Sequence, residues 1–400
     1  MKNKKPRIVS PFVYKILKLL VRPVAFFLWK YRYKDFYKIA KNENVVVLSN
    51  HQTDIDPILI QLSFNKLLHT VATDNLFKKG FVNNFLTWLG AIPKRKGVTD
   101  LRTGHEMSNV VKEGGSLLIF PEGNRSYAEF QYYIAPNIGR LVKSLDATLV
   151  VFNLHGGTGV KPRFASKRRK GPFYGTIRRV IKRDEYANMT CEELSEIIIN
   201  DLRVYDSDSG SLYKCKKRAE YLERMLFVCP VCGKAQTLSS KNEFISCSSC
   251  GLKVEFTEDL HLKSDNSAFK FTRLVEWYNL QKKWVRKLKV KDDEPIFVDH
   301  NVKLNSAELH KKKVVLSTGD LTINQKEMIF GEHHFDLTKI EIASPVSGRK
   351  FVFTYEGMPY EAKGNEQFNP LKYVLLLNKL DTKMKRDKVD KYYSLEEDEK

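Results

Sequence analysis

The 400-residue chain has little cysteine, a shortage of acidic residues and no long apolar run. Six cysteines are too few for a disulfide scaffold, and 47 Asp and Glu against 68 Lys and Arg leave a net charge of +21. Apolar residues make up 42% of the chain, which excludes general disorder and suffices for about two to three domains of roughly 150 residues. The positive charge calls for an anionic partner, which nucleic acid, a membrane surface or a phosphorylated small molecule could supply.

The N-terminal segment is rich in apolar residues but carries no transmembrane pattern. Its longest charge-free piece, Pro23 to Trp29, is far shorter than the roughly 18 to 20 residues that a membrane span needs. No small-residue cleavage site of a signal peptide follows. We therefore expect neither a span nor a cleaved leader.

The same segment has the pattern of an amphipathic helix. Ser10 before Pro11 is a suitable helix start, and helical spacing places Lys15, Lys18 and Arg22 along one face with apolar side chains around the rest. Residues 1–40 contain eleven Lys or Arg and a single acid. This favours a helix in the headgroup layer of an anionic membrane, and the alternative is a helix packed on the protein's own core.

Short β-branched runs alternate with helical patterns between residues 44 and 154. The runs that read as buried strands are 44–50, 67–73, 116–120 and 148–154. The stretches that read as helices are 55–64, 76–89, 99–113 and 137–145. This alternation predicts an α/β domain with a central, largely buried sheet flanked by helices.

The later part of the chain has a different texture. Polar helices are expected from residue 190 to about 224, and another helix from about 269 to 288 with Trp277 and Trp284 on one face. After residue 313, short alternating runs separated by turns precede one helical stretch near 370–380. These runs predict a small antiparallel β domain closed by a helix.

The first predicted strand is followed by Asn50, His51 and, five residues after His51, Asp56. On a continuous helix two side chains five residues apart diverge, so they can meet only across a strand-to-helix turn, which Pro57 favours. A His held by a carboxylate has a fixed tautomer and can act as a general base. The pair by itself is a weak signal.

Two further turns carry positive charge. Phe120 to Ser126 reads FPEGNRS at the end of a strand, where α/β folds place their sites and where an Arg beside a Ser can hold a phosphate. Gly90 to Pro93 forms a second strand-like turn that leads into three consecutive cations, Lys94 to Lys96. One base and two phosphate-sized positive clusters indicate acyl or phosphoryl transfer on a phosphorylated substrate.

With these blocks the chain resembles the glycerolipid acyltransferase family, whose members acylate glycerol-3-phosphate or lysophosphatidic acid. The family's NHxxxxD block stands at Asn50, His51 and Asp56, and its FPEGxRS block at 120–126. The second block stands at 90–93 and the fourth is approximated by 149–154. The resemblance covers about residues 40–190, in the family's order and spacing.

The resemblance implies a role for each matched residue. His51 would be the general base on the acceptor hydroxyl, contributing ~10² to 10⁴-fold, and Asp56 would hold its imidazole. The residues that would position the glycerol phosphate are Glu122, Gly123, Arg125 and Ser126. Because the chain has no serine nucleophile elbow, direct transfer is simpler than an acyl-enzyme.

The chain departs from the family pattern in two blocks. The second block usually ends in an Asp-Arg pair, whereas here Arg95 and Lys96 follow without an acid, so we expect one of these two cations to contact the phosphate. The fourth block lacks its usual Pro and continues into His155 and a glycine-rich turn. We expect a structural role for His155, as for His69 and His105.

Residues 161–183 hold ten Lys or Arg and no acid, with aromatic residues between them. Nucleic acid could bind such a segment. Beside an acyltransferase domain, contact with anionic lipid headgroups or with an acyl carrier is the simpler interpretation, so nucleic acid is not expected as a partner.

Four cysteines follow the spacing C-x2-C-x14-C-x2-C, each pair with a Gly directly after its second member. This spacing resembles the knuckles of a zinc ribbon, and four thiolates make a closed structural site rather than a catalytic one. The predicted ligands of one structural zinc ion are Cys229, Cys232, Cys247 and Cys250. No catalytic metal is expected, and disulfides are the alternative for these pairs.

Residues 296–381 resemble the pleckstrin-homology-like folds in their strand pattern and closing helix. The predicted division is an interfacial helical segment, an acyltransferase domain, a zinc ribbon, a helical connector, a pleckstrin-homology-like domain and a charged tail, at 1–40, 41–225, 226–256, 257–295, 296–381 and 382–400. The arrangement as a whole resembles bacterial members of the family.

The function implied by this resemblance is transfer of a fatty acyl group from acyl-CoA or acyl carrier protein to lysophosphatidic acid, which makes phosphatidic acid. Glycerol-3-phosphate or another lysophospholipid is the alternative acceptor, and a non-catalytic lipid-binding scaffold is the alternative function. The expected location is the cytoplasmic face of the cell membrane, with peripheral attachment to an anionic phospholipid surface.

Overall fold

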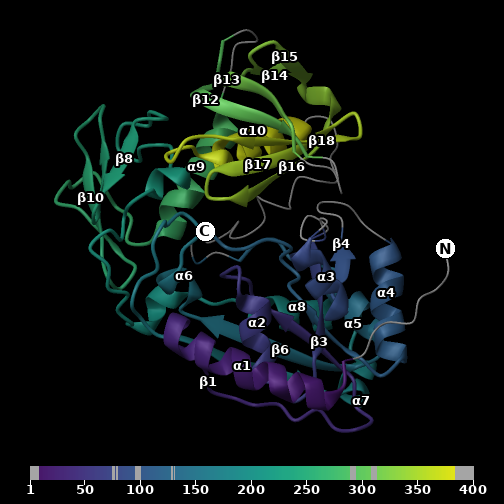
Figure 1. Cartoon of the computed structure of the whole chain (residues 1–400). Coiled ribbons are helices and arrows are strands. Elements are labelled where there is room, and N and C mark those ends of the chain that lie inside the picture. Colours follow the sequence, from purple (N-terminus) through teal and green to yellow (C-terminus); the bar gives the residue numbers. More distant parts are fainter. Residues whose placement is uncertain are drawn as a thin grey trace. The chain divides into compact units, whose positions relative to one another are not determined.

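The computed structural model describes residues 9–73, 77, 80–94, 101–127, 129, 131–288, 294–307 and 313–382. By contacts the chain divides into two compact units (Figure 1). The first contains residues 1–126, 130–160 and 171–206, and the second contains residues 127–129, 161–170 and 207–400. Residues 127–129 and 161–170 thus belong to the second unit although residues of the first unit flank them in the chain. The division into six segments given above stays a prediction.

A seven-stranded mixed sheet forms the centre of the first unit, in the order β1-β7-β6-β2-β5-β3-β4. Its strands are β1 (Tyr31–Tyr33), β2 (Val45–Ser49), β3 (Leu68–Thr73), β4 (Ile92–Lys94), β5 (Ser116–Ile119), β6 (Thr148–His155) and β7 (Phe173–Ile181). The five strands from β6 to β4 are parallel, while β7 runs antiparallel to β6. The carboxyl ends of the five parallel strands therefore share one edge.

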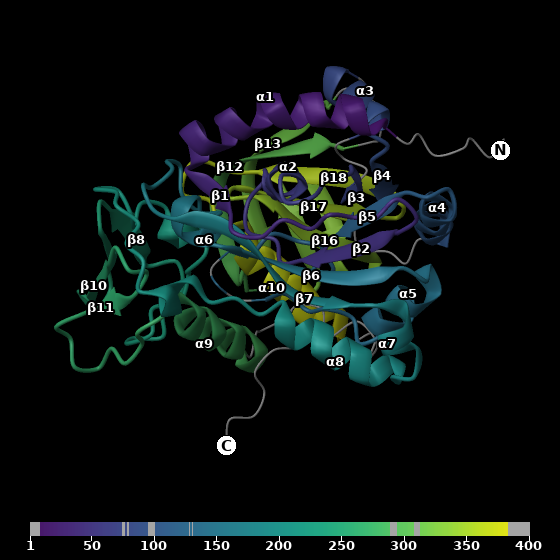
Figure 2. The same ribbon diagram turned by 90° about the horizontal axis from the view of Figure 1, so that it is seen from below.

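Helices cover both faces of this sheet. They are α1 (Pro11–Trp29), α2 (Asp56–Gln61), α3 (Phe81–Trp88), α4 (Leu101–Lys112), α5 (Ile138–Leu145), α6 (Gly157–Val160), α7 (Arg183–Ala187) and α8 (Cys191–Asp201). Figure 2 shows α1 on one side of the sheet and α5 and α8 on the other.

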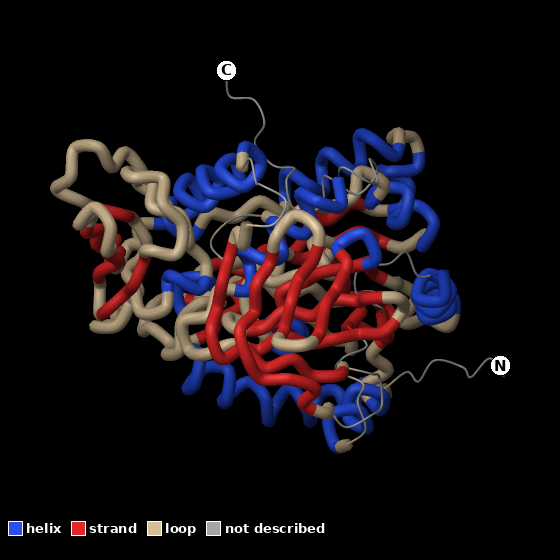
Figure 3. Tube along the Cα trace, turned by 90° about the horizontal axis from the view of Figure 1, so that it is seen from above, coloured by secondary structure: helices blue, strands red, loops and turns tan. Residues whose placement is uncertain are grey.

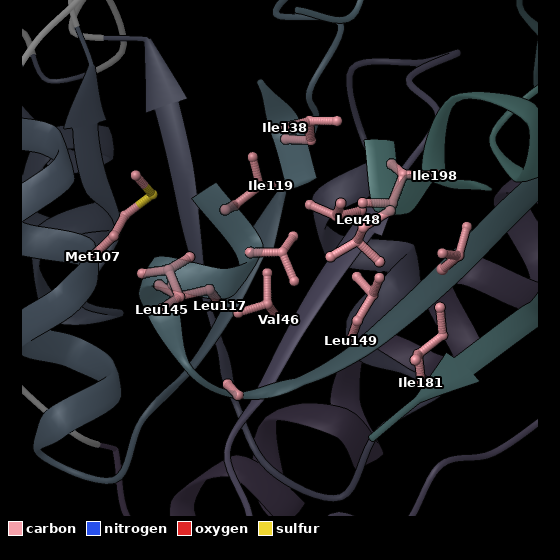
Figure 4. Packing of buried hydrophobic residues seen from close by; sticks show 14 of the residues in the cluster. Val46, Leu48, Met107, Leu117, Ile119, Ile138, Leu145, Leu149, Ile181 and Ile198 are labelled. Carbon is pink, nitrogen blue, oxygen red and sulfur yellow. The ribbon is translucent and has the colours of Figure 1, made fainter. Parts of the chain in front are cut away.

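The face towards α4, α5 and α8 holds the main core cluster (Figure 4). Val46 and Leu48 on β2 point to this face, because alternate strand residues share a side, and they are fully buried. They pack with Leu149 of β6 and with helix residues such as Val142 and Ile198. The buried sheet expected from the apolar runs is confirmed.

The four strands and four helices expected between residues 44 and 154 are confirmed, with ends within a few residues where described. The helices expected over 190–224 are wrong beyond Asp201, where the chain forms only the 3-10 turns Asp206–Ser209 and Leu222–Arg224. The basic segment 161–183 contains β7, which the charge pattern did not predict.

Helix α1 begins as expected, with the Ser10 hydroxyl accepting a hydrogen bond from Val13 N at 3.3 Å and Pro11 in its first turn. Of the three cations expected along one face, Lys15 and Arg22 are exposed and Lys18 is half-buried. Lys18 lies on the inward face with Tyr14, and its Nζ donates to the Phe64 carbonyl at 2.6 Å. The apolar side chains instead face outward.

These outward residues are spaced along the length of α1. Those exposed by 45% to 73% are Phe12, Ile16, Leu19, Leu20, Val24, Phe27 and Leu28. We call these seven side chains the α1 apolar ridge. No helix among the described residues is long and apolar enough to cross a membrane.

The second unit begins with a four-stranded antiparallel sheet that carries the cysteine cluster. Its strands are β8 (Leu238–Lys241), β9 (Phe244–Cys247), β10 (Lys253–Phe256) and β11 (Leu262–Lys263), in the order β11-β10-β9-β8. Helix α9 (Leu274–Lys287) follows, and Trp277 on it is fully buried and donates from Nε1 to the Val228 carbonyl at 2.8 Å. The helix expected near 269–288 is confirmed.

A seven-stranded antiparallel sheet and a closing helix complete the described part of this unit, and Figure 3 shows the strands as red tubes. The strands are β12 (Phe297–Ser306), β13 (Val315–Ile323), β14 (Glu327–Phe330), β15 (His333–Asp336), β16 (Ile340–Ser347), β17 (Lys350–Tyr355) and β18 (Met358–Lys363). A four-strand and a three-strand meander join through β12 and β18, and α10 (Pro370–Thr382) follows. The expected β domain with a closing helix is confirmed, while the tail after Thr382 lies outside the described residues.

Candidate functional site

His51 and Asp56 meet across the turn that joins β2 to α2. His51 Nδ1 lies 2.9 Å from Asp56 Oδ2, and Asp56 is the first residue of α2, with Pro57 in the first turn. The imidazole stacks on the ring of Phe120 at 4.2 Å between centroids and keeps 18% of its side chain exposed. With Nδ1–H donated to the carboxylate, Nε2 is the nitrogen that can accept a proton.

The Asp56 carboxylate is fully buried and is held by the turn itself. Its Oδ2 also accepts hydrogen bonds from the backbone N–H groups of Gln52 at 2.6 Å and Thr53 at 2.8 Å. Its Oδ1 accepts one from the Thr53 hydroxyl. These bonds compensate the buried charge and hold the oxygen that orients His51.

Glu122 connects this turn to the loop after β5. Its Oε1 accepts from the backbone N–H of His51 at 3.2 Å, and its Oε2 accepts from that of Tyr132 at 2.9 Å. Burial raises the pKa of Glu122 to about 8, although both backbone hydrogen bonds act in the opposite direction. The carboxyl group of Glu122 thus ties two loops together.

The rest of the loop after β5 forms a tight turn beside His51. Gly123 N–H donates to the Phe120 carbonyl at 3.0 Å, and Gly123 has φ +63°, a conformation that glycine adopts without strain. Ser126 N–H donates to the His51 carbonyl at 2.8 Å. The structure therefore brings the two sequence blocks together, with the Arg125 guanidinium 3.9 Å from the Asp54 carboxylate.

The remaining predicted substrate contacts, Arg95 and Lys96, lie outside the described residues. Gly90 to Pro93 lead into β4, which pairs in parallel with β3 and ends at Lys94. Since parallel strands end at a common edge, the chain leaves β4 on the side of the sheet where His51 lies.

Two histidines that we expected to be structural have partners within the fold. His155 at the end of β6 stacks on Tyr174 at 4.9 Å, with its Nε2 3.2 Å from the Thr176 hydroxyl. Burial, together with the charge of Lys34, lowers the pKa of His155 to about 4. His69 is buried, and its Nδ1 lies 3.0 Å from the Gly90 carbonyl.

Residues to which the sequence analysis gave no role also hold the site. The Asn50 side chain exchanges two hydrogen bonds with the backbone of Leu154, at 2.9 and 2.8 Å, and so joins the ends of β2 and β6. Thr53 and Tyr132 hold the two carboxyl groups described above. Asn50 and Thr53 lie within the NHxxxxD block, whereas no motif pointed to Tyr132.

The basic segment 161–183 is largely engaged within the protein. Arg163 and Arg169 are buried, and Arg178 and Arg179 pair with Asp201. The aromatic residues Phe164 and Phe173 are core residues with at most 1% exposure. Lys182 and Arg183 pair with Glu43 and Asp146. The cationic surface expected here is therefore smaller than the residue count indicates.

The four cysteines of the second unit form one cluster, in which all sulfurs lie within 4.8 Å of one another. The Sγ atoms are 3.6 Å apart for Cys229 and Cys250 and 3.8 Å apart for Cys232 and Cys247. These separations exceed the roughly 2.05 Å of a disulfide. Four sulfurs placed tetrahedrally about 2.3 Å from a zinc ion would lie about 3.8 Å apart, so the donor set fits such an ion.

The two halves of the cysteine cluster have the same backbone geometry. Gly233 N–H donates to the Cys229 carbonyl at 3.0 Å, and Gly251 N–H donates to the Cys247 carbonyl at 3.0 Å. Both glycines have positive φ, +69° and +73°. Each CxxCG sequence therefore closes a turn that presents its two sulfurs to the same point.

The turn that carries His51 and Asp56 lies in a part of the chain that is similar to known proteins. The model of the Acyltransferase family matches residues 30–155. Over 90 residues the chain is 31% identical to a 1-acyl-sn-glycerol-3-phosphate acyltransferase of Borreliella burgdorferi, an alignment that covers 22% of this chain and 36% of the relative. The chain thus spans about a third of the length of that curated relative.

A solved structure is also similar, at a low level. It is the crystal structure of a 1-acyl-sn-glycerophosphate acyltransferase from Thermotoga maritima, with 19% identity and a TM-score of 0.40, over 48% of this chain and 77% of that one.

The raised pKa of Glu122 predicts a pH-dependent contribution to stability. Because the pKa rises from 4.5 to about 8 on folding, the folded state binds more protons between these values. The stability that protonation of Glu122 contributes is fully present below pH 4.5 and is lost as the pH rises through 8. Glu122→Gln has no titrating group at this position. The difference in free energy of unfolding, wild type minus variant, measured by urea titration, should therefore fall by roughly a few kcal/mol across this pH range. A difference that is constant with pH would contradict the prediction.

Proposed function

We propose that the protein is a glycerolipid acyltransferase, since its residues 30–155 match the Acyltransferase family model, and that it transfers a fatty acyl group from a thioester donor to the free hydroxyl of lysophosphatidic acid. The product would be phosphatidic acid. The donor is proposed to be acyl-CoA or acyl carrier protein. The observation that carries this proposal is the oriented His51–Asp56 pair beside the turn of Gly123 and Arg125.

The proposed reaction needs one base. His51 Nε2 takes the proton of the acceptor hydroxyl while that oxygen attacks the thioester carbonyl carbon. The new C–O bond forms, the C–S bond breaks, and the proton passes to the leaving thiolate. Asp56 holds the imidazole in the tautomer with the proton on Nδ1 and stabilises the imidazolium that forms.

The phosphate of the acceptor is proposed to lie at the loop after β5. Gly123 lets the backbone turn there with nothing within 4 Å of its Cβ position. The Arg125 guanidinium offers several N–H donors in a geometry that suits phosphate. The Asp54 carboxylate 3.9 Å away is 62% exposed, so it is a weak competitor in water. One cation from Arg95 or Lys96 would add to this contact.

His51→Ala should lower kcat by ~10² to 10⁴-fold, because it removes the base while leaving the fold intact. Initial rates would be measured with labelled acyl-CoA and acyl carrier protein as donors, and with lysophosphatidic acid, glycerol-3-phosphate and other lysophospholipids as acceptors. His105→Ala is the matched control, since His105 is exposed on α4 and should retain wild-type activity.

Two outcomes would count against this assignment. Transfer by His51→Ala within tenfold of the wild-type rate would exclude His51 as the base. Absence of product from the wild-type protein with every donor and acceptor would favour the lipid-binding scaffold.

The α1 apolar ridge is proposed to dock on the cytoplasmic face of an anionic membrane, giving peripheral attachment. An exposed apolar face of this length is costly in water unless something covers it. Lys15 and Arg22 are exposed on the same helix, and Lys30 is exposed at its C-terminal cap, which suits acidic headgroups around the inserted side chains. The inward face, anchored by Tyr14 and Lys18, would keep the helix on its domain.

The triple variant Phe12→Ser, Leu19→Ser, Phe27→Ser should lose most of its binding to vesicles of phosphatidylglycerol in co-sedimentation, because it removes three of the most exposed ridge residues. The matched control is Leu101→Ser with Leu212→Ser, which changes exposed apolar residues outside α1 and should bind like wild type. Equal sedimentation of the triple variant and wild type would remove α1 from the docking surface.

One structural zinc ion is proposed to be held by Cys229, Cys232, Cys247 and Cys250. As a closed set of four thiolates, these ligands would leave no open position for a substrate. The metal would hold the two knuckle turns together and stabilise the short strands around them.

The purified protein should contain about one zinc ion per chain, and Cys229→Ser with Cys247→Ser should lower this to near zero and lower the melting temperature. Zinc would be measured by elemental mass spectrometry. Cys191→Ser and Cys215→Ser are the matched controls, because neither residue belongs to the cluster. Zinc-free wild type prepared without chelators would contradict the proposal.

A further inference from the structure

Asp206 is a buried carboxylate that no sequence motif indicates. It is 2% exposed and begins a 3-10 turn five residues after the end of α8. Its Oδ1 accepts the N–H of Gly156 at 2.6 Å, and its Oδ2 accepts the N–H of Thr158 at 3.3 Å together with the Thr158 hydroxyl. The carboxylate therefore holds the turn between β6 and α6.

The side chain of Gln52 connects Asp206 to the turn that carries His51 and Asp56. Its Nε2 donates to Asp206 Oδ2 at 3.2 Å, and its Oε1 accepts the N–H of Gly157 at 2.8 Å. The backbone N–H of Gln52 donates to Asp56 Oδ2 at 2.6 Å, the same oxygen that lies 2.9 Å from His51 Nδ1. One residue thus links the buried carboxylate to the oxygen that orients the proposed base.

The packing around Gln52 leaves no room for this link to shift. Gln52 is 4% exposed, and a Cβ added to Gly157 would lie 2.5 Å from its Oε1 and 2.8 Å from its Cβ. Glycine at this position therefore lets the turn approach the Gln52 side chain closely. Loss of a hydrogen bond here would displace the backbone that carries His51 rather than be absorbed by a loose side chain.

We infer that Asp206 is a positioning residue for the proposed acyl transfer, acting through Gln52 to hold the His51–Asp56 turn against the turn after β6. This inference rests on the proposed function only for its kinetic readout. The groups that reach the carboxylate from Gly156, Thr158 and Gln52 are hydrogen-bond donors, which is the pattern that an ionised acid satisfies.

The environment of Asp206 acts on its pKa in two opposing directions. Burial raises the pKa of Asp206, while the hydrogen bonds from Thr158, Gly156 and Gln52 lower it. An asparagine at this position would direct its NH₂ group towards at least one of these donors. One N–H of the network would then be left buried without an acceptor.

Asp206→Asn should lower kcat by about 10- to 100-fold while KM changes little, because a displaced base affects the transition state more than substrate binding. Gln52→Ala should have a similar effect. If both act through one link, the double variant should be no slower than the slower single variant. Asp201→Asn is the matched control: Asp201 is also buried in the first unit but pairs with Arg178 and Arg179, and its kcat should stay near wild type.

A readout without turnover separates failure of this inference from failure of the proposed function. In ¹H–¹⁵N spectra of the full chain, the Nδ1–H of His51, identified by its absence in His51→Ala, should shift in Asp206→Asn and Gln52→Ala and stay in place in Asp201→Asn. If the wild type has no acyltransferase activity, this shift still supports the positioning role.

Other outcomes overturn the inference. An unchanged His51 signal in both variants would do so, as would losses in kcat that multiply in the double variant. A loss of activity explained entirely by a smaller folded fraction, measured by circular dichroism, would show a role in stability alone. Should Asp206→Asn fail to fold, Gln52→Ala breaks the same link without altering the buried carboxylate, and its kcat and His51 signal decide the question.

Discussion

The parallel register of β2, β5 and β6 is the constraint on which the site depends. Leu48 pairs with Ile119 and Ser49 with Phe152, so the carboxyl ends of the three strands lie at one edge of the sheet. The loop after β2 is therefore a neighbour in space of the loops after β5 and β6, although 71 residues separate His51 from Glu122 and 104 separate Asn50 from Leu154. Hydrogen bonds from Asn50 to Leu154 and from Ser126 to His51 then lock these loops together.

Backbone amides, rather than cations, satisfy the buried acids around His51. Asp56 is held by the N–H groups of Gln52 and Thr53, and Glu122 by those of His51 and Tyr132. A main-chain N–H group cannot move away from the carboxyl group as a lysine side chain can. Each acid therefore also fixes the position of the backbone that donates to it.

Helix α1 shows the limit of a local prediction. Its start at Ser10 and Pro11 follows from local chemistry, whereas the sequence left two partners open for its apolar side chains, a membrane and the protein's own core. In the structure Lys18 takes an inward position because the Phe64 carbonyl accepts a hydrogen bond from its Nζ and the rings of Tyr14 and Phe36 lie close to its ammonium group. Burial lowers the pKa of Lys18 to about 8, and the apolar ridge is left facing outward.

The elements and the local chemistry could be predicted from the sequence: the alternation of strands and helices, the His51–Asp56 turn that Pro57 follows, and the two CxxCG knuckles. These depend on contacts within a few residues, which a linear pattern records. Three features became visible only in the tertiary structure. Glu122 connects two loops, most cations of 161–183 pair with acids or are buried within the protein, and Asp206 accepts a hydrogen bond from Gln52. The Glu122–His51 and Asp206–Gln52 contacts join residues 71 and 154 positions apart, and they arise from sheet register and burial, which leave no periodic trace in the chain.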